Sequence, residues 1–352
     1  MTAHRHALVA GATGIVGRRI AERLHASGWE VTGLCRRPPP EPLRYALIAV
    51  DLTDSADCRT KLAQLTSVTH VFYAARYDHP EGVAESVEVN AAMLTNLIEG
   101  IEPAARDLRH VNLVHGTKYY GHMLGPLKLP LTEETPRAHT PVFYFPQEDF
   151  VRSRSRGKAW TYSTARPHTF CDEDSAELRN AALLMAVHAT LARERGTPFV
   201  FPGSEKAFHA RTQFTFVPLL ARAVEWMAGE PRCANQCYNI TNGDSPRWSD
   251  LWARFADYFG VATAPPRKTR LAESVSDNET VWQALVARHG LEPGALADRV
   301  LWAYADYLFA PEWDIISDVS KARRNGFSES LDSAAMFVDL FDRLRREKII
   351  PP

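Results

Sequence analysis

The stretch that decides the fold is His6-Ala-Leu-Val-Ala-Gly11-Ala-Thr-Gly14-Ile-Val-Gly17, close to the start of the chain. Its first five residues form a short apolar run that ends in glycine, which predicts a buried strand. Ile15, Ile20 and Leu24 then recur at helical spacing, and a glycine at position 28 predicts the end of that helix. Three glycines at this spacing, between a strand and a helix, are typical of a turn that binds the pyrophosphate of a dinucleotide.

Each glycine of this turn has its own predicted role. Gly11 permits the tight turn, Gly14 lets the backbone approach the pyrophosphate, and Gly17 allows the helix to pack closely on the strand. The N-terminus of the helix supplies free N–H groups and the positive end of the helix dipole. The alternative is a purely structural tight turn. The sequence predicts dinucleotide contacts from Gly11, Thr13, Gly14, Ile15 and Gly17.

The first half of the chain continues as alternating strands and helices. Further strands are expected at 30–35, 45–50, 68–74 and 111–114, with helices at 57–65 and 83–101. This alternation predicts an α/β fold, a Rossmann-like doubly wound parallel sheet with helices on both faces. Residues 1–175 are expected to form the dinucleotide-binding core and to carry two candidate catalytic residues, Lys118 and Tyr144.

The second half, residues 176–352, has a looser pattern and is expected to complete the sheet and to form a smaller, mainly helical substrate lobe. Helices are predicted at 178–194, 215–229 and 246–259, short strands at 199–201 and 237–241, and a helix-rich stretch at 277–309. That stretch carries Trp282, Trp302, Tyr304, Tyr307 and Phe309. Aromatic residues in such a stretch more often pack in the hydrophobic core than line a ligand site. However, folds of this kind place the substrate in a lobe beside the nucleotide-binding sheet, so these residues are also candidates to line it.

Composition excludes several classes of protein. The 352 residues include 41 Lys and Arg against 42 Asp and Glu, a formal charge of −1, which argues against an extended nucleic-acid-binding surface. No run of about 18 apolar residues is present to span a membrane. The basic run at 152–158 is interpreted as a solvated helix end.

The five cysteines are scattered, so a secreted disulfide framework is not expected. Cys233 and Cys237 have neither a second pair nor a suitably spaced histidine, so no metal site is predicted. A reduced, cytoplasmic protein is the expectation.

The end of the second strand bears on the choice of cofactor. It carries Arg36 and Arg37 where an NAD-binding protein would usually carry Asp or Glu. Guanidinium groups bind a 2′-phosphate, so the sequence favours NADP(H); two solvated arginines are the alternative. Asp51, at the end of the third strand, is placed to accept a hydrogen bond from the adenine amino group or to cap the following turn. Further cofactor contacts are predicted at Leu52, Ala74, Pro167 and Phe170.

Two further segments carry the family resemblance. They are Gly116-Thr-Lys118-Tyr-Tyr-Gly and Phe143-Tyr144-Phe145-Pro-Gln-Glu148-Asp149. Most extended short-chain dehydrogenases/reductases carry a Tyr-x-x-x-Lys pair near residue 150, but here Tyr144 is followed four positions later by Glu148. The two segments resemble the progesterone 5β-reductase/iridoid synthase-like family of atypical extended short-chain dehydrogenases/reductases, and the resemblance covers essentially the whole chain. It departs from the family at His168-Thr-Phe-Cys-Asp172, where a Gly- and Ile-containing turn usually lines the nicotinamide.

The resemblance implies NADPH-dependent reduction of the C=C bond of an α,β-unsaturated carbonyl compound, a steroid-like or small cyclic enone. The hydroxyl of Tyr144 would stabilise the enolate oxygen after hydride reaches the β-carbon, and Lys118 would orient the cofactor ribose. The alternative for Tyr144 is an aromatic side chain on an apolar patch. Two other functions stay open: an NADP-dependent carbonyl reductase or sugar-nucleotide epimerase/dehydratase, and a non-catalytic NADP(H) sensor. The expected partner is a small-molecule enone, and pairing as a homodimer is left open.

Overall fold

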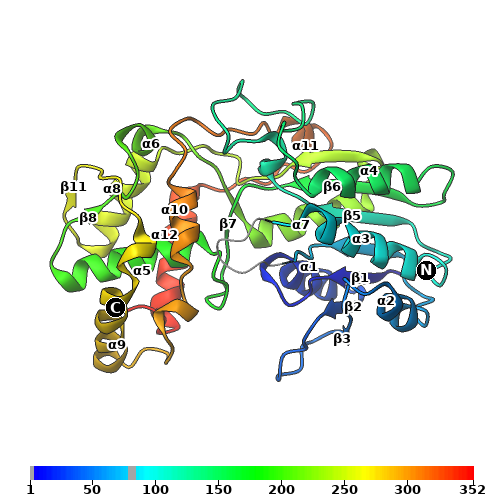
Figure 1. The fold of residues 1–352 in the computed structure, drawn as a ribbon, viewed down its shortest axis with the longest axis horizontal. Helices are drawn as coiled ribbons and strands as arrows, with labels where there is room; N and C mark the ends of the chain where they lie inside the picture. Colours follow the sequence, from blue (N-terminus) through cyan, green and yellow to red (C-terminus); the bar gives the residue numbers. More distant parts are fainter. Residues whose placement is uncertain (1–3, 78–84) are drawn as a thin grey trace.

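A parallel sheet of seven strands forms the centre of the larger lobe (Figure 1). The computed structural model describes residues 4–77 and 85–352. The strands of the sheet are β1 (His6–Ala10), β2 (Glu30–Cys35), β3 (Ala46–Ala49), β4 (His70–Tyr73), β5 (His110–Val114), β6 (Thr161–Arg166) and β10 (Gln236–Asn239). They lie in the order β10-β6-β5-β4-β1-β2-β3, and all neighbouring pairs are parallel. The order changes direction between β1 and β4, the point where doubly wound sheets bind their ligands.

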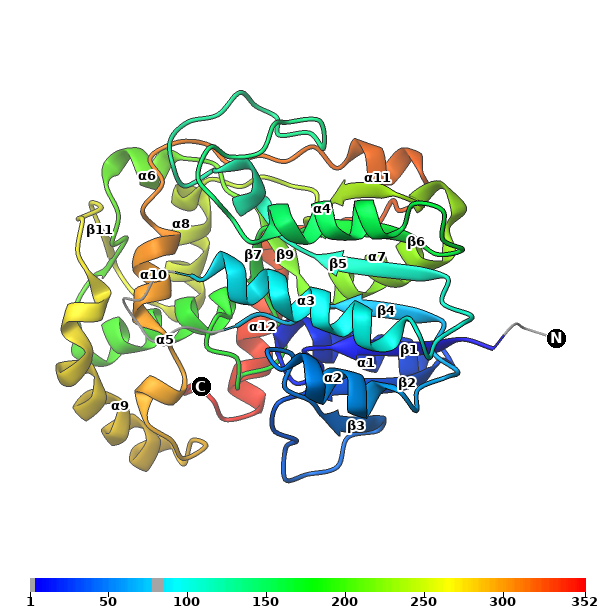
Figure 2. The same ribbon diagram turned by 45° about the vertical axis from the view of Figure 1, so that its right-hand side comes forward.

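Helices cover both faces of the sheet because both faces are apolar. In β1, Ala7 and Val9 pack into one core, while Leu8 and Ala10 pack into the other. The first core is covered by α1 (Ile15–Ala26) and α7 (Val217–Gly229), and the second by α2 (Ser55–Leu62), α3 (Val87–Ile101) and α4 (Tyr144–Arg154). Figure 2 shows α3 and α4 in front of the sheet, running roughly along the strands. The predicted Rossmann-like doubly wound sheet is confirmed.

The smaller lobe is mainly helical and lies at the carboxyl ends of the strands (Figure 1). Its helices are α5 (Ala181–Arg195), α6 (Glu205–His209), α8 (Trp248–Phe259), α9 (Val275–His289), α10 (Trp302–Leu308) and α12 (Ser333–Arg346). Two short strand pairs accompany them, β7 (Thr169–Cys171) with β9 (Phe214–Phe216) and β8 (Phe199–Val200) with β11 (Thr263–Ala264). The short helix α11 (Ser320–Arg324) lies beside β10 instead.

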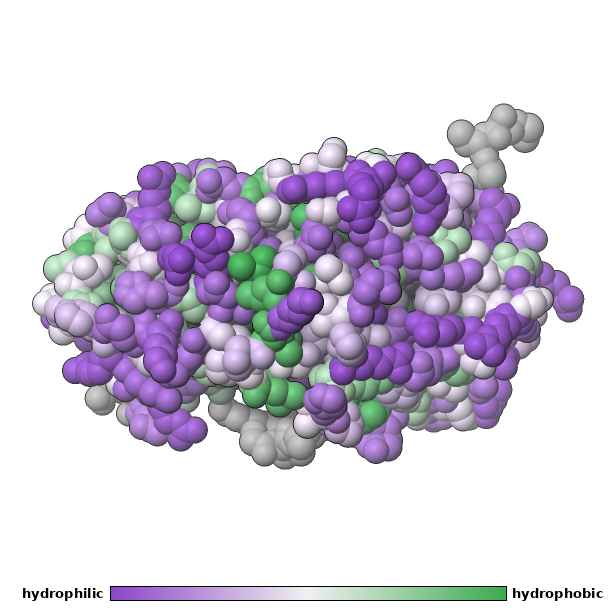
Figure 3. Space-filling model, turned by 90° about the horizontal axis from the view of Figure 1, so that it is seen from above, coloured by the Kyte–Doolittle hydropathy of each residue, from purple (hydrophilic) through white to green (hydrophobic). Residues whose placement is uncertain are grey.

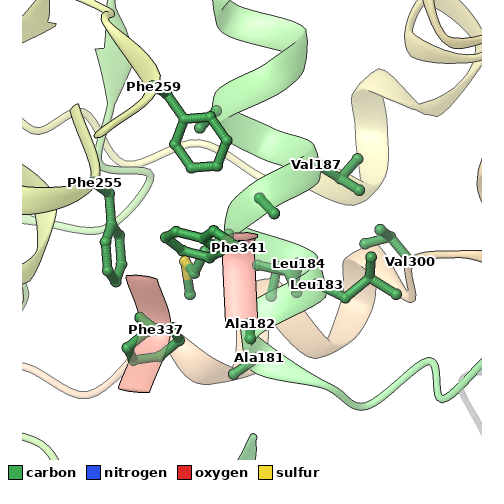
Figure 4. Packing of buried hydrophobic residues seen from close by; sticks show 14 of the residues in the cluster. Ala181, Ala182, Leu183, Leu184, Val187, Phe255, Phe259, Val300, Phe337 and Phe341 are labelled. Carbon is green, nitrogen blue, oxygen red and sulfur yellow. The ribbon is translucent and has the colours of Figure 1, made fainter. Parts of the chain in front are cut away.

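The core of the smaller lobe surrounds α5, most of whose residues are buried, as expected of a helix that is apolar on every side. Figure 4 shows Phe255 of α8 with Phe337 and Phe341 of α12 gathered beside α5. The small side chains of Ala181 and Ala182 leave room for these rings. This packing gives the smaller lobe a hydrophobic core of its own.

The predicted elements lie within a few residues of those observed. The helix expected at 83–101 begins at Val87, because the hydroxyl of Ser86 accepts a hydrogen bond from the N–H of Val89 and caps the helix; residues 83 and 84 lie outside the described residues. Although β10 and α7 come from the second half of the chain, they complete the larger lobe. The division of the chain at residue 175 stays a prediction.

Candidate active site

The glycine turn between β1 and α1 has the geometry of a phosphate-binding loop. Gly11 has a positive φ of +77°, and its N–H and that of Ala12 both donate to the carbonyl of Leu34. A Cβ on Gly17 would lie 2.1 Å from the carbonyl oxygen of Gly11, so only glycine allows α1 to start this close to the strand. Among the described residues, no side chain caps α1, which leaves its first N–H groups available to an anion.

A cavity of about 490 Å³ opens beside this turn, along the carboxyl ends of β1 to β4. Nine of the predicted cofactor residues line it: Gly11, Thr13, Gly14, Ile15, Arg36, Asp51, Leu52, Ala74 and Phe170. Gly17 lies under the turn, and Arg37 is exposed and does not line the cavity. The structure therefore gathers residues from four strand ends around one cavity, at the edge of the sheet where doubly wound folds bind their ligands.

The surroundings of Asp51 are compatible with both of its predicted roles. Its Oδ1 accepts hydrogen bonds from the N–H and the hydroxyl of Thr53, at 2.9 and 2.7 Å. These bonds, with a smaller contribution from the charge of Arg36, lower the pKa of Asp51, so it is a carboxylate at neutral pH. Helix α2 is capped by Asp54 instead. Asp51 holds its own turn and still faces the cavity.

A second cavity, of about 360 Å³, adjoins the first and contains both candidate catalytic residues. Lys118 lies on the turn after β5, and Tyr144 is the first residue of α4. Phe170 lines both cavities, as do Arg76 and Arg179, while Pro167 lines only the second. The predicted dinucleotide contacts and the predicted catalytic pair thus face one continuous region at the carboxyl edge of the sheet.

Tyr144 is held by contacts on two sides. Its ring stacks on the buried ring of His115, with centroids 4.5 Å apart and planes 19° from parallel. A Cβ on Gly116 would lie 3.3 Å from the Tyr144 hydroxyl, so this glycine makes room for the oxygen. Burial, helped by the charge of Glu85, raises the pKa of Tyr144 well above its usual value, and the charge of Arg76 opposes this rise. The phenol is neutral at pH 7 and can donate a hydrogen bond.

Lys118 is paired with Glu85, a residue that no sequence motif indicated. Its Nζ lies 2.7 Å from Oε2 of Glu85, and Oε1 of Glu85 lies 2.9 Å from Nε of Arg76. Glu85 precedes α3 and Arg76 follows β4, so only the fold brings them beside Lys118. All three charged side chains line the cavity that contains Tyr144.

The first three residues of the segment at 168–172, where the sequence departs from the family pattern, line this cavity. His168 donates its backbone N–H to the hydroxyl of Thr215 at 3.0 Å, and its Nδ1 lies 2.5 Å from the hydroxyl of Thr117. Burial, together with the nearby His122, lowers the pKa of His168 well below its usual value. A neutral imidazole therefore lies beside the turn that carries Lys118.

The aromatic stretch of the second half is divided between the core of the smaller lobe and the wall of a cavity. Trp282, Trp302 and Phe309 are buried in the smaller lobe. Tyr304 and Tyr307, from α10, line the same cavity as Tyr144. Sequence periodicity could not separate these roles, because whether a helix face meets the core or a cavity depends on the neighbouring lobe.

A third cavity, of about 720 Å³, lies within residues 120–139. Figure 3 views the molecule from the side that carries this segment and shows an apolar patch near the middle of a mostly hydrophilic face. The cavity is the largest of the three, but none of the predicted catalytic or cofactor residues lines it. The predicted catalytic and cofactor-binding residues lie at the carboxyl ends of the strands instead.

Solved structures of known proteins share this fold. A short-chain dehydrogenase/reductase superfamily protein from Agrobacterium tumefaciens, solved with bound NAD, superposes with a TM-score of 0.69 at 14% identity, over 98% of each chain. UDP-glucose 4-epimerase from Thermotoga maritima superposes with a TM-score of 0.66 at 14% identity, over 97% of this chain and 99% of that one. At these identities the likeness establishes a Rossmann-like fold and nothing finer.

Sequence similarity identifies the family of the chain. The profile described as a PRISE-like Rossmann-fold domain matches residues 50–351, and the chain belongs to this family. It is 33% identical to a 3-oxo-Δ4,5-steroid 5β-reductase of Arabidopsis thaliana, over 98% of this chain and 93% of the relative. It is 30% identical to an (S)-8-oxocitronellyl enol synthase of Catharanthus roseus, over 98% and 92%. The resemblance predicted from the Lys118 and Tyr144 segments is confirmed.

No helix in the described part of the chain is long and apolar enough to cross a membrane.

Proposed function

We propose that this oxidoreductase uses NADPH to reduce the C=C bond of α,β-unsaturated carbonyl compounds. The observation that carries the proposal is the position of Tyr144. Its neutral hydroxyl lies against Gly116, in a cavity that also holds Lys118 and continues into the glycine-turn cavity. The relatives named as a steroid 5β-reductase and an enol synthase support the same reaction type.

The glycine turn and the cavity beside it fit NADPH. The backbone at Gly14 is uncrowded, since a Cβ there would meet its nearest neighbour at an ordinary contact distance of 3.6 Å, and this leaves room for a phosphate against the backbone. Arg36 supplies a guanidinium for a 2′-phosphate, and the carboxylate of Asp51 can accept from an adenine amino group. When bound, the cofactor supplies the hydride.

Tyr144 then serves as the donor to the substrate. As hydride reaches the β-carbon, negative charge grows on the carbonyl oxygen, and the phenol O–H stabilises it without losing its proton. Lys118 adds positive charge beside this oxygen and orients the cofactor ribose. The α-carbon takes its proton from water, so the product is the saturated ketone. Tyr304 and Tyr307 offer ring faces to an apolar steroid-like or small cyclic enone.

The test is a panel of enones that includes 2-cyclohexen-1-one and progesterone, with NADPH consumption followed by absorbance and products identified by mass spectrometry. The saturated ketone is the expected product. An allylic alcohol would identify a carbonyl reductase instead. Binding of NADPH without turnover of any enone or ketone would favour the non-catalytic sensor.

Cofactor preference provides a second test. Replacing Arg36 with alanine is expected to narrow the preference for NADPH over NADH by about 10-fold or more, because it removes a charge-assisted contact to the 2′-phosphate. Arg37→Ala is the matched control, since the Arg37 side chain does not line the cavity. The measurement is the ratio of kcat/KM for the two cofactors. An unchanged ratio in Arg36→Ala would place the determinant elsewhere.

A further inference from the structure

Three side chains that can ligate a metal ion meet at the start of the central sheet: His4, His6 and Glu30. One ligand atom from each, a ring nitrogen or a carboxylate oxygen, lies within 4.8 Å of the other two. Nε2 of His4 lies 3.2 Å from Oε2 of Glu30, and Nδ1 of His6 lies 3.8 Å from Oε1 of the same carboxylate. In the described part of the chain, no other three His, Cys, Asp or Glu side chains approach one another in this way.

The pairing of β1 with β2 brings the three residues together. In the parallel register of these strands, His6 is the partner of Glu30. The paired backbone includes the residue before β1, because the N–H of Glu30 donates to the carbonyl of Arg5 at 3.0 Å. Residues two apart in an extended chain point to the same face of a sheet, so the sequence His4-Arg5-His6 places both imidazoles on the face of Glu30. Two paired strands, and not a loop, therefore set this arrangement.

The ring of His6 is held in an orientation that suits a metal ligand. Its side chain is 3% exposed, and its Nε2 lies 2.9 Å from the hydroxyl of Thr32, which is two residues after Glu30 on the same face. A metal-ligating histidine usually donates its other ring N–H to such a partner, which fixes the ring and directs the remaining nitrogen at the ion. That nitrogen, Nδ1, also lies 2.9 Å from the hydroxyl of the exposed residue Ser67, which can rotate away from it.

The ligand atoms and their spacing fit a divalent transition-metal ion. Zn²⁺ binds histidine nitrogen and carboxylate oxygen at about 2.0–2.2 Å, which in a tetrahedral site separates neighbouring ligand atoms by about 3.3–3.5 Å. The contact of His4 with Glu30 already has nearly this spacing, and that of His6 needs only a small shift. The side chains of His4 and Glu30 are 61% and 53% exposed, so they have room to make this shift. Imidazole ligands also favour such ions over Mg²⁺ and Ca²⁺, which prefer oxygen.

We propose that His4, His6 and Glu30 bind a divalent transition-metal ion such as Zn²⁺, with water in the fourth position. The role of the ion is structural: it joins the segment before β1 to β2. This end of β1 is far from the smaller lobe, whereas the candidate active site lies at the carboxyl ends of the strands (Figure 1). The proposal is therefore independent of the proposed function. The spacing of the cysteines could not indicate this site, because its ligands meet only through strand pairing.

The first experiment is a calorimetric titration with Zn²⁺ of protein from which bound metal has been removed with EDTA. The wild-type protein is expected to bind one ion per chain in a saturable way. His4→Ala and Glu30→Gln each remove one ligand and should weaken binding by about 10-fold or more, because even the partners of metal ligands contribute about 10–100-fold to affinity. The matched controls, His25→Ala and Glu41→Gln, remove an exposed imidazole and an exposed carboxylate elsewhere and should bind as the wild type does. No saturable binding by the wild type, or wild-type affinity in His4→Ala and Glu30→Gln, would overturn the proposal.

Thermal unfolding separates metal binding from the ion pair that His4 and Glu30 can form by themselves. In EDTA, His4→Ala and Glu30→Gln should unfold at nearly the wild-type temperature, because an ion pair between exposed side chains contributes little. When Zn²⁺ is added, the Tm of the wild type should rise with its concentration, since an ion that binds only the folded protein stabilises it. The two variants should show a smaller rise or none. An equal rise in all three proteins would show that Zn²⁺ binds at other residues and would overturn the proposal.

Discussion

Replacing Tyr144 with phenylalanine is expected to lower kcat for enone reduction by about 10²-fold to 10³-fold. Losing one donor to a developing oxyanion typically has this effect. The ring, its stacking on His115 and its place at the start of α4 would all be kept. The substitution therefore removes little more than the O–H group. The measurement is single-turnover oxidation of NADPH in the presence of saturating enone.

The stability of the protein should be unaffected by this change. Among the described residues, none hydrogen-bonds the Tyr144 hydroxyl, so no internal hydrogen bond is lost, and the free energy of unfolding should stay within about 1 kcal/mol of wild type. Tyr258→Phe is the matched control for the activity measurement. It removes the same atom from α8, where the hydroxyl donates to Asp342 outside both cavities. Near-normal turnover in Tyr144→Phe would show that another group stabilises the enolate.

The fold could be predicted from the sequence because local patterns determine it. The apolar run before Gly11 and the helical spacing after Gly14 follow from short-range periodicity, and β1 and α1 begin and end within a residue or two of the expected positions. The short strands of the smaller lobe, such as β8 with its two residues, carry too little pattern to assign bounds. Their pairing is decided by the aromatic core around them.

The candidate site could be predicted only where it coincides with a motif. Lys118 and Tyr144 were found through their neighbours in sequence, and the structure places both in one cavity. Glu85 and Arg76 lie on a connection between β4 and α3 that has no distinctive pattern, and their meeting with Lys118 depends on strand order. For the pair Arg36 and Arg37, a basic pair at a strand end does not tell which member lines the cavity; the structure places Arg36 there, and a contact from Arg37 stays a prediction.

The second large effect is expected from a pair of glycine substitutions that separate cofactor binding from folding. Gly14→Ala places a methyl group at an ordinary contact distance, 3.6 Å from the carbonyl oxygen of Gly11, on a backbone with φ of −94° that alanine adopts easily. The protein should keep its free energy of unfolding to within about 1 kcal/mol. The same methyl group would lie where the pyrophosphate approaches, so NADPH affinity should fall by about 10-fold or more.

Gly17→Ala should act on the fold itself. Its Cβ would lie 2.1 Å from the carbonyl oxygen and 2.6 Å from the carbonyl carbon of Gly11, and because these are backbone atoms, α1 must move away from the strand. The expected loss is about 1–3 kcal/mol of unfolding free energy or more, accompanied by loss of NADPH binding. Thermal unfolding and fluorescence titration with NADPH measure the two quantities. Each variant serves as the control for the other, because both add one methyl group within a single turn. If Gly14→Ala binds NADPH with wild-type affinity, the phosphates of the cofactor lie elsewhere. If Gly17→Ala keeps the wild-type free energy of unfolding, α1 can shift without cost.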